Sequence, residues 1–117
     1  MIITNTKRSG IARTIIFKIG KKFKAVCLDF DIIEEADTRE VAELQIKEAI
    51  IGYIENVCKN KLDDKLLNRH AEKKYWERYN KYLRLIKKPQ KIINVESTSM
   101  FTIPFTMPIN AKMLCSV

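Results

Sequence analysis

The chain has 117 residues, of which 46% are hydrophobic and 31% charged, and its formal net charge is +8. This length suits one domain with a modest core, and no apolar run reaches the roughly 18 residues that suggest a membrane-spanning helix. We expect neither a membrane segment nor an export signal. Three widely spaced cysteines, Cys27, Cys58 and Cys115, fit reduced thiols better than a disulfide framework, so we expect a cytoplasmic protein.

The positive charge is concentrated in one segment. Residues 59–91 carry 12 Lys/Arg and four Asp/Glu, which accounts for the whole excess, whereas residues 1–58 carry nine of each. A local excess of this kind indicates a surface for nucleic acid or for an acidic protein, or else a solvated basic face.

The first half of the chain has the pattern of a β-hairpin. Apolar residues alternate along the chain on both sides of Gly20, which suits a turn because glycine adopts unusual backbone angles at little cost. On the first strand, Ile15, Phe17 and Ile19 share one face. The predicted elements are a mobile arm or short edge strand at 1–10, strands at 11–19 and 23–30, and a short third strand at 32–35.

A helix is predicted from Asp37 to about Asn60. Asp37 is a good N-cap, and Glu40 three residues later can complete a capping box. The apolar residues that follow recur at helical spacings over more than one narrow stripe. We therefore expect this helix to be covered on more than half of its circumference and to form the centre of the domain.

A second, basic helix is predicted at 63–88, with Asp63 or Asp64 as its cap and Pro89 as its stop. On a helical projection the aromatic residues fall in one arc of about a third of the circle, and cations occupy most of the remainder. We expect the rings to be buried against the domain or another subunit. The aromatic residues are Tyr75, Trp76, Tyr79 and Tyr82, and the cations are Lys73, Lys74, Arg78, Lys81, Arg84 and Lys88.

Residues 99–107 alternate well enough to predict a last strand. Phe101, Ile103 and Phe105 share one face. Pro104 falls on the polar side, where its missing N–H confines it to a sheet edge or a bulge. This strand could join the sheet of its own chain or the sheet of a partner chain.

Few residues indicate catalysis. Asp29 and Asp31 would share a strand face and could hold a divalent metal as part of a nuclease site, although an exposed acidic loop is the ordinary interpretation. His70 is the single histidine and has no visible catalytic neighbours. Phosphate-binding loops, dinucleotide-binding glycine patterns and paired Cys-x-x-Cys units are all absent from the sequence. We therefore expect no enzymatic activity, no cofactor and no metal.

The basic helix is the main functional candidate outside the first half. Its cations could contact the phosphates of DNA or RNA, but the helical period places its rings on the buried arc, away from bases. A solvated basic face explains the same pattern equally well. A membrane-surface role is weaker, because the apolar arc is needed to hold the helix onto the domain.

The segment 23–55, FKAVCLDFDIIEEADTREVAELQIKEAIIGYIE, resembles the HicB antitoxin family and its standalone relatives. The shared pattern is a strand, a bend, a short strand, then Asp-Thr, Glu and an amphipathic helix. Asp37, Thr38 and Glu40 match that pattern, whereas Ala36 replaces the usual glycine and the bend lacks the usual proline.

The resemblance implies a partial RNase H-like β-β-β-α-β fold without a nuclease's full set of carboxylates. It also implies oligomers and a partner toxin, a small RNA-cleaving protein whose site the antitoxin covers. DNA-binding members add a helix-turn-helix or ribbon-helix-helix domain, for which residues 92–117 are too short and too strand-like. Antitoxins of basic toxins are usually acidic, so only the neutral first half of this chain suits such a contact.

Together these features predict a single α+β domain, 1–117, with a mainly antiparallel sheet in the order β-β-β-α-α-β packed on a central helix. Its parts would be a HicB-like core at about 11–58, a long basic helix at 63–88 and a strand at 99–107. The leading hypothesis is a non-enzymatic, antitoxin-like or regulatory interaction module that forms a homodimer or higher homo-oligomer. The alternative is a nucleic-acid-binding protein that uses the helix at 64–88.

Overall fold

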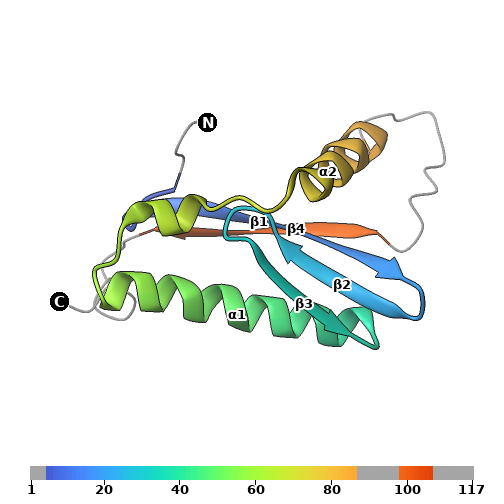
Figure 1. Ribbon diagram of the computed structural model, residues 1–117, viewed down its shortest axis with the longest axis horizontal. Coiled ribbons are helices and arrows are strands. Elements are labelled where there is room, and N and C mark those ends of the chain that lie inside the picture. The colour runs from blue at the N-terminus through green and yellow to red at the C-terminus, as the bar shows by residue number, and fades with distance from the viewer. Residues whose placement is uncertain (1–4, 87–97, 107–117) are drawn as a thin grey trace.

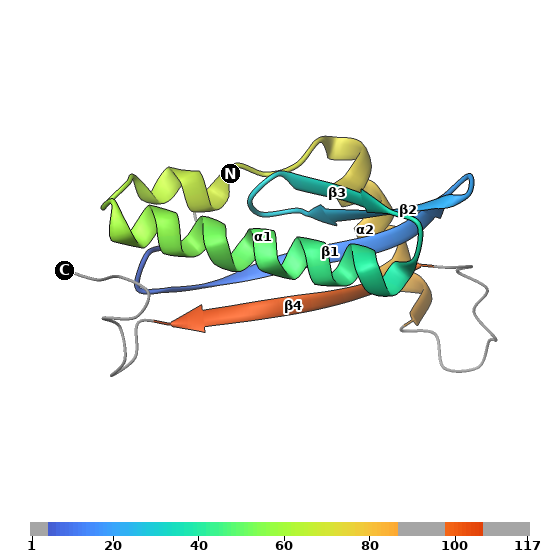
Figure 2. The same cartoon turned by 90° about the horizontal axis from the view of Figure 1, so that it is seen from below.

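The computed structural model describes residues 5–86 and 98–106. It is an α+β fold, as predicted, with one antiparallel sheet of four strands in the order β3-β2-β1-β4. One helix lies on each face of the sheet (Figures 1 and 2). The elements are β1 (Ser9–Ile19), β2 (Lys22–Cys27), β3 (Ile32–Ala36), α1 (Arg39–Lys59), the 3-10 helix η1 (Asp64–Asn68), α2 (Lys73–Ile86) and β4 (Ser99–Thr106).

The hairpin of β1 and β2 divides its side chains between two cores, as its alternation predicts. Ile16 on β1 and Ala25 on β2 are cross-strand partners and belong to the core beneath α1. Ile15 and Val26 are the next pair along and belong to the core beneath α2. Gly20 turns the chain with a φ of 61°, which glycine adopts without strain.

Helix α1 covers one face of the sheet, but its cap differs from the prediction. Thr38 is the N-cap, and its hydroxyl accepts a hydrogen bond from the Val41 N–H at 3.2 Å. Val41 therefore occupies the position that a capping-box glutamate would need, and Glu40 is one residue too early. Asp37 instead lies 3.4 Å from Lys22 in an exposed ion pair across the start of β2.

The continuous helix predicted at 63–88 is divided in two. Asp63 caps η1, and α2 begins only at Lys73, after a link in which His70 has a φ of 61°. The link cannot be helical because its N–H groups donate elsewhere. The His70 N–H donates to the Asp29 carbonyl at 3.1 Å, and the Ala71 N–H donates to the Leu28 carbonyl at 2.8 Å.

Strand β4 pairs with β1 of its own chain at the edge of the sheet, where Pro104 is tolerated. The predicted mobile arm is ordered from Asn5 onward. The Asn5 side chain is fully buried, and its amide donates to the carbonyls of Ile11 and Leu67 at 3.0 and 2.8 Å. These bonds hold the chain in place just before β1, whose first residue, Ser9, pairs with Thr106 of β4.

The cysteines differ from the expectation of reduced thiols. Cys27 is a free thiol with no exposed surface, whereas Cys58 at the end of α1 is disulfide-bonded. Sequence spacing carries no information about which sulfur atoms meet in the fold, so the expectation is wrong for Cys58. Cys115 lies outside the described residues. Within the part of the chain that the structure describes, no helix is both long and apolar enough to cross a membrane.

Candidate binding surfaces

Helix α2 turns its aromatic side chains toward the sheet. Tyr75 and Tyr79, one turn apart, are buried in the core with Ile15, Phe17 and other residues of β1 and β2. Trp76 and Tyr82 are half-buried along the edges of the same arc. The rings therefore contribute mainly to packing within the chain and leave the opposite face of α2 to charged residues.

The cations predicted on α2 are exposed where the structure describes them. Only one of them has an ion pair among the described side chains: Lys73 lies 4.0 Å from Glu77, and both are well exposed, so the pair adds little stability. Lys88 lies outside the described residues, and the exposed cations are Lys73, Lys74, Arg78, Lys81 and Arg84.

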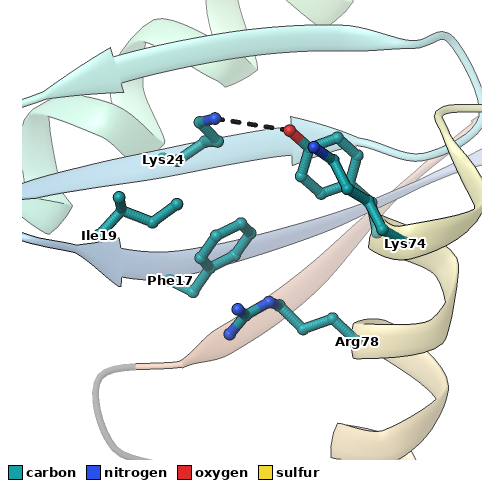
Figure 3. A pocket seen from close by; sticks show the side chains of 6 residues that line it. Phe17, Ile19, Lys24, Lys74 and Arg78 are labelled. Carbon is teal, nitrogen blue, oxygen red and sulfur yellow. Dashed lines mark hydrogen bonds between the residues drawn. The ribbon is translucent and has the colours of Figure 1, made fainter.

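Two of these cations meet a third from the sheet around a hollow of about 230 Å³, which we call the cationic hollow. Figure 3 shows Lys74 and Arg78 on α2, with Arg78 extended beneath Phe17, and Lys24 on β2 turned toward the Tyr75 hydroxyl. The hollow is lined by Phe17, Ile19, Lys24, Lys74, Tyr75 and Arg78.

Aromatic rings position the three cations. The Arg78 guanidinium carbon lies 4.1 Å from the centre of the Phe17 ring. The ammonium groups of Lys24 and Lys74 lie 5.8 and 5.1 Å from the centre of the Tyr75 ring, and Lys24 is also 3.4 Å from the Tyr75 hydroxyl. Cation–π contacts of this kind contribute about 0.5–1 kcal/mol each at exposed sites and restrict where the charges can go.

The sequence predicted Lys74 and Arg78 as candidate contact residues, but it did not identify Lys24 on the sheet as part of the same site. A signal for Lys24 existed, because it has the same strand parity as Val26 and therefore faces the side of the sheet that also carries Phe17 and Ile19. What the sequence did not indicate was that α2 covers this side of the sheet, since no local pattern assigns a helix to one face.

The carboxylate pair proposed for a metal does not form. The Asp29 side chain is fully buried and paired with Arg13, whose guanidinium donates to its two oxygens at 2.8 and 3.1 Å. The Arg13 backbone N–H donates to the same carboxylate at 2.8 Å. Asp31 is exposed in the turn after β2 with a φ of 59°, so the two residues share no strand face. No group of three or more His, Cys, Asp or Glu side chains suited to a metal occurs among residues 5–86 and 98–106.

The Arg13–Asp29 pair is structural. Arg13 stacks on Trp76 of α2, with its guanidinium carbon 5.1 Å from the ring centre, and hydrogen bonding to Asp29 raises the Arg13 pKa. The carbonyl of Asp29 also accepts the His70 N–H. Asp29, in the turn after β2, thus connects to β1 through its carboxylate and to the link before α2 through its backbone carbonyl. His70, expected on a solvated helical face, is half-buried in that link.

A second surface lies on the far side of the molecule, along the exposed face of α1. Val41, Leu44 and Ile51 are 43%, 58% and 47% exposed there, which is unusual for large apolar side chains on one helix. Gly52 lies in the same exposed stretch, and a Cβ added to it would meet no atom within 4 Å. We call this surface, with its exposed carboxylates Glu40, Glu48 and Glu55, the α1 outer face.

The α1 outer face continues toward β4. Lys47 pairs with Glu43 and lies 4.9 Å from the centre of the Phe101 ring, so it bridges the helix and the edge strand. Phe101 and Ile103 on β4 are only partly buried beneath it. Apolar surface therefore extends from the helix onto the sheet.

Comparisons with known proteins leave the chain without an assigned family: no protein-family model matches it, and neither the curated proteins nor the solved structures contain a significant match.

Proposed function

We propose that the protein is a non-enzymatic binding module that holds a basic protein partner on the α1 outer face. The observation that carries this proposal is the exposure of Val41, Leu44 and Ile51 on one side of the central helix. An ordinary helix at the surface of a domain places polar residues there, and contiguous exposed apolar surface is typical of interaction sites.

The shape of this face supports close contact with another protein. Glycine in a helix interior costs about 1 kcal/mol relative to alanine, and no atom of the described residues would collide with a Cβ at Gly52. A glycine lets another backbone or a large side chain approach the helix closely. Leu44 and Ile51 on one side of it would then act as anchors, since buried apolar groups at the centre of an interface contribute most to binding.

The charge of this face indicates the sign of the partner. Glu40, Glu48 and Glu55 are exposed around the apolar residues, while Lys47 is already paired with Glu43. A partner with a basic rim around an apolar ridge would complement them, and its association would be faster at low salt. A second copy placed symmetrically on this face would bring like charges together, so we assign the face to a different protein.

This proposal agrees with the resemblance of residues 23–55 to HicB antitoxins, which implies a basic RNA-cleaving toxin as the partner. On this view the protein is antitoxin-like or regulatory and has a partner encoded beside it. The homodimer or higher homo-oligomer expected from the sequence stays a prediction, which light scattering of the purified chain will test.

The experiment is to co-express the chain with each protein encoded beside it and to titrate any co-purifying partner by calorimetry. The test variant is Leu44→Lys with Ile51→Lys, which removes the anchors and adds repulsion toward a basic partner. The matched control is Lys81→Glu with Arg84→Glu, which changes two exposed residues of α2 on the other face.

We expect the α1 variant to lose about 30-fold or more in affinity, as for interface residues worth 2 kcal/mol or more, and the α2 control to bind as the wild type does. The proposal fails if no such protein binds the wild type with a Kd below about 10 μM. It also fails if a partner binds and the α1 variant retains wild-type affinity.

A further inference from the structure

We infer that the cationic hollow binds an unpaired nucleotide of single-stranded nucleic acid. In this arrangement the base stacks on the guanidinium of Arg78, and the phosphate lies between Lys24 and Lys74. The site is on the opposite face of the sheet from the α1 outer face (Figures 1 and 3), so this inference stands independently of the protein partner.

Arg78 provides a flat, charged platform. Its guanidinium carbon lies 4.1 Å from the centre of the Phe17 ring, and Phe17 itself is 1% exposed and held by the core. The guanidinium therefore lies over a ring that is buried in the core, while the Arg78 side chain remains exposed. Guanidinium planes stack on nucleic acid bases, and a platform fixed in advance loses little freedom on binding.

Lys24 and Lys74 concentrate positive charge beside this platform. Both ammonium groups lie within 6 Å of the centre of the same ring, that of Tyr75, so two positive charges are held around one side chain. Glu35 lies 3.6 Å from Lys24 and offsets part of this positive charge. Among the described residues, no carboxylate is within ion-pair distance of Lys74 or Arg78. A phosphate would neutralise this excess and receive hydrogen bonds from both amines.

The apolar part of the hollow distinguishes a nucleotide from a simple anion. Ile19 is 47% exposed at its rim, where it offers a surface for a base or sugar and nothing to a free phosphate. Arg84 and Lys81 extend the positive charge along the exposed side of α2, which suits a polymer. A base within a duplex stays stacked on its neighbours and cannot reach Arg78, so single strands should bind more tightly than duplexes.

The test is a fluorescence-anisotropy titration with labelled 12-nucleotide oligouridylate, oligothymidylate and a 12-base-pair duplex at about 50 and 200 mM salt. We expect both single strands to bind more tightly than the duplex. Two variants probe the two parts of the site. Arg78→Lys keeps the charge and removes the plane, and we expect a loss of about fivefold or more for the single strands with little change for the duplex.

Lys74→Ala has a closely matched control in Lys73→Ala, because the two neighbours carry the same charge and only Lys74 lines the hollow. Loss of one phosphate contact should lower the salt slope for single strands by about 0.7 in Lys74→Ala, and Lys73→Ala should leave the slope unchanged. Circular dichroism and thermal melting will show that each variant is folded. The inference is overturned if no oligonucleotide binds at the lower salt, if the duplex binds as tightly as the single strands, or if the two lysine variants lose affinity equally.

Discussion

The two faces of the sheet are covered by helices that are held in different ways. Beneath α1, the core consists of aliphatic and aromatic side chains, with Ile46 and Ile50 of the helix fully buried against them. Beneath α2, the core is smaller, and its border is charged: Arg13 stacks on Trp76 and Arg78 stacks on Phe17. Cations border the α1 core as well, for example Lys47 at the Phe101 ring, so what sets the α2 side apart is a smaller core together with the buried Arg13–Asp29 ion pair.

The difference appears on the outer surfaces as well. Helix α2 turns its aromatic residues toward the sheet and its cations outward, and its one largely exposed apolar residue is Ile86, the last residue of the helix. Helix α1 has more apolar residues than its buried side can use, so Leu44 and Ile51 remain exposed. A helix with exposed apolar residues favours binding of a protein partner, while an exposed basic face favours contact with solvent or with an anion. The two proposed binding surfaces follow from this contrast, and four experiments test it.

The largest effect is expected at the charged border of α2. Asp29→Asn removes the charge that compensates Arg13, and breaking a buried ion pair costs about 3–5 kcal/mol. Urea unfolding will measure this loss. Asp31→Asn is the control, because Asp31 is exposed and asparagine tolerates its positive φ. Equal stability of the two variants would show that the Arg13–Asp29 pair does not hold the α2 side.

The apolar side is tested by two truncations on α1. Ile46→Ala, at a position with no exposed surface, should cost about 2–5 kcal/mol through lost burial and the cavity that remains. Leu44→Ala, two residues earlier and 58% exposed, should stay within about 0.5 kcal/mol of the wild type. Chemical denaturation of the isolated chain measures both. A large cost for Leu44→Ala would mean that this face is already buried, for example in a homo-oligomer.

Two glycines should respond to alanine in opposite directions. A Cβ on Gly10 would lie 2.3 Å from the Asn5 Oδ1 atom and 2.6 Å from the Phe105 ring, so Gly10→Ala should destabilise the fold by about 1–3 kcal/mol. Gly52→Ala meets no atom and should stabilise the chain by about 0.5–1 kcal/mol. Thermal melting ranks the two variants. A destabilised Gly52→Ala would contradict the open α1 outer face.

The last test asks whether the core beneath α1 excludes water. Burial raises the pKa of the Cys27 thiol to about 12, against an ordinary value of 9.0. The Cys27 thiol has a higher pKa in the folded protein than in the unfolded chain. Burial of the neutral thiol therefore contributes its full stability below about pH 9, and this contribution is lost as the pH rises toward 12. At pH 9.0, alkylation of Cys27 in the native protein should be roughly a thousandfold slower than in urea. Peptide mass spectrometry without reductant will measure alkylation of Cys27. Similar alkylation rates in the native protein and in urea would contradict a core that excludes water.

Much of the fold follows from local patterns. The hairpin around Gly20, the short third strand, the central helix and the last strand were all predictable, because period-2 and helical alternation survive wherever one face is buried. The inward direction of Tyr75 and Tyr79 followed from the same rule. The strand face of Lys24, which lines the cationic hollow, could also be predicted from the alternation of the strand. Nothing in the sequence indicated that α2 covers that face.

Contacts between distant residues decided the rest. The helical pattern after Asp64 is broken because the carbonyls of Leu28 and Asp29 accept the N–H groups of the link, and no pattern within residues 63–88 records that competition. The sequence indicated Asp29 as a possible metal ligand, but in the fold its carboxylate pairs with Arg13 of β1. The sequence by itself determined which side chains alternate and where helices are favoured. The tertiary structure decided which charges are neutralised and which remain exposed, since pairing depends on neighbours that the chain supplies only once it has folded.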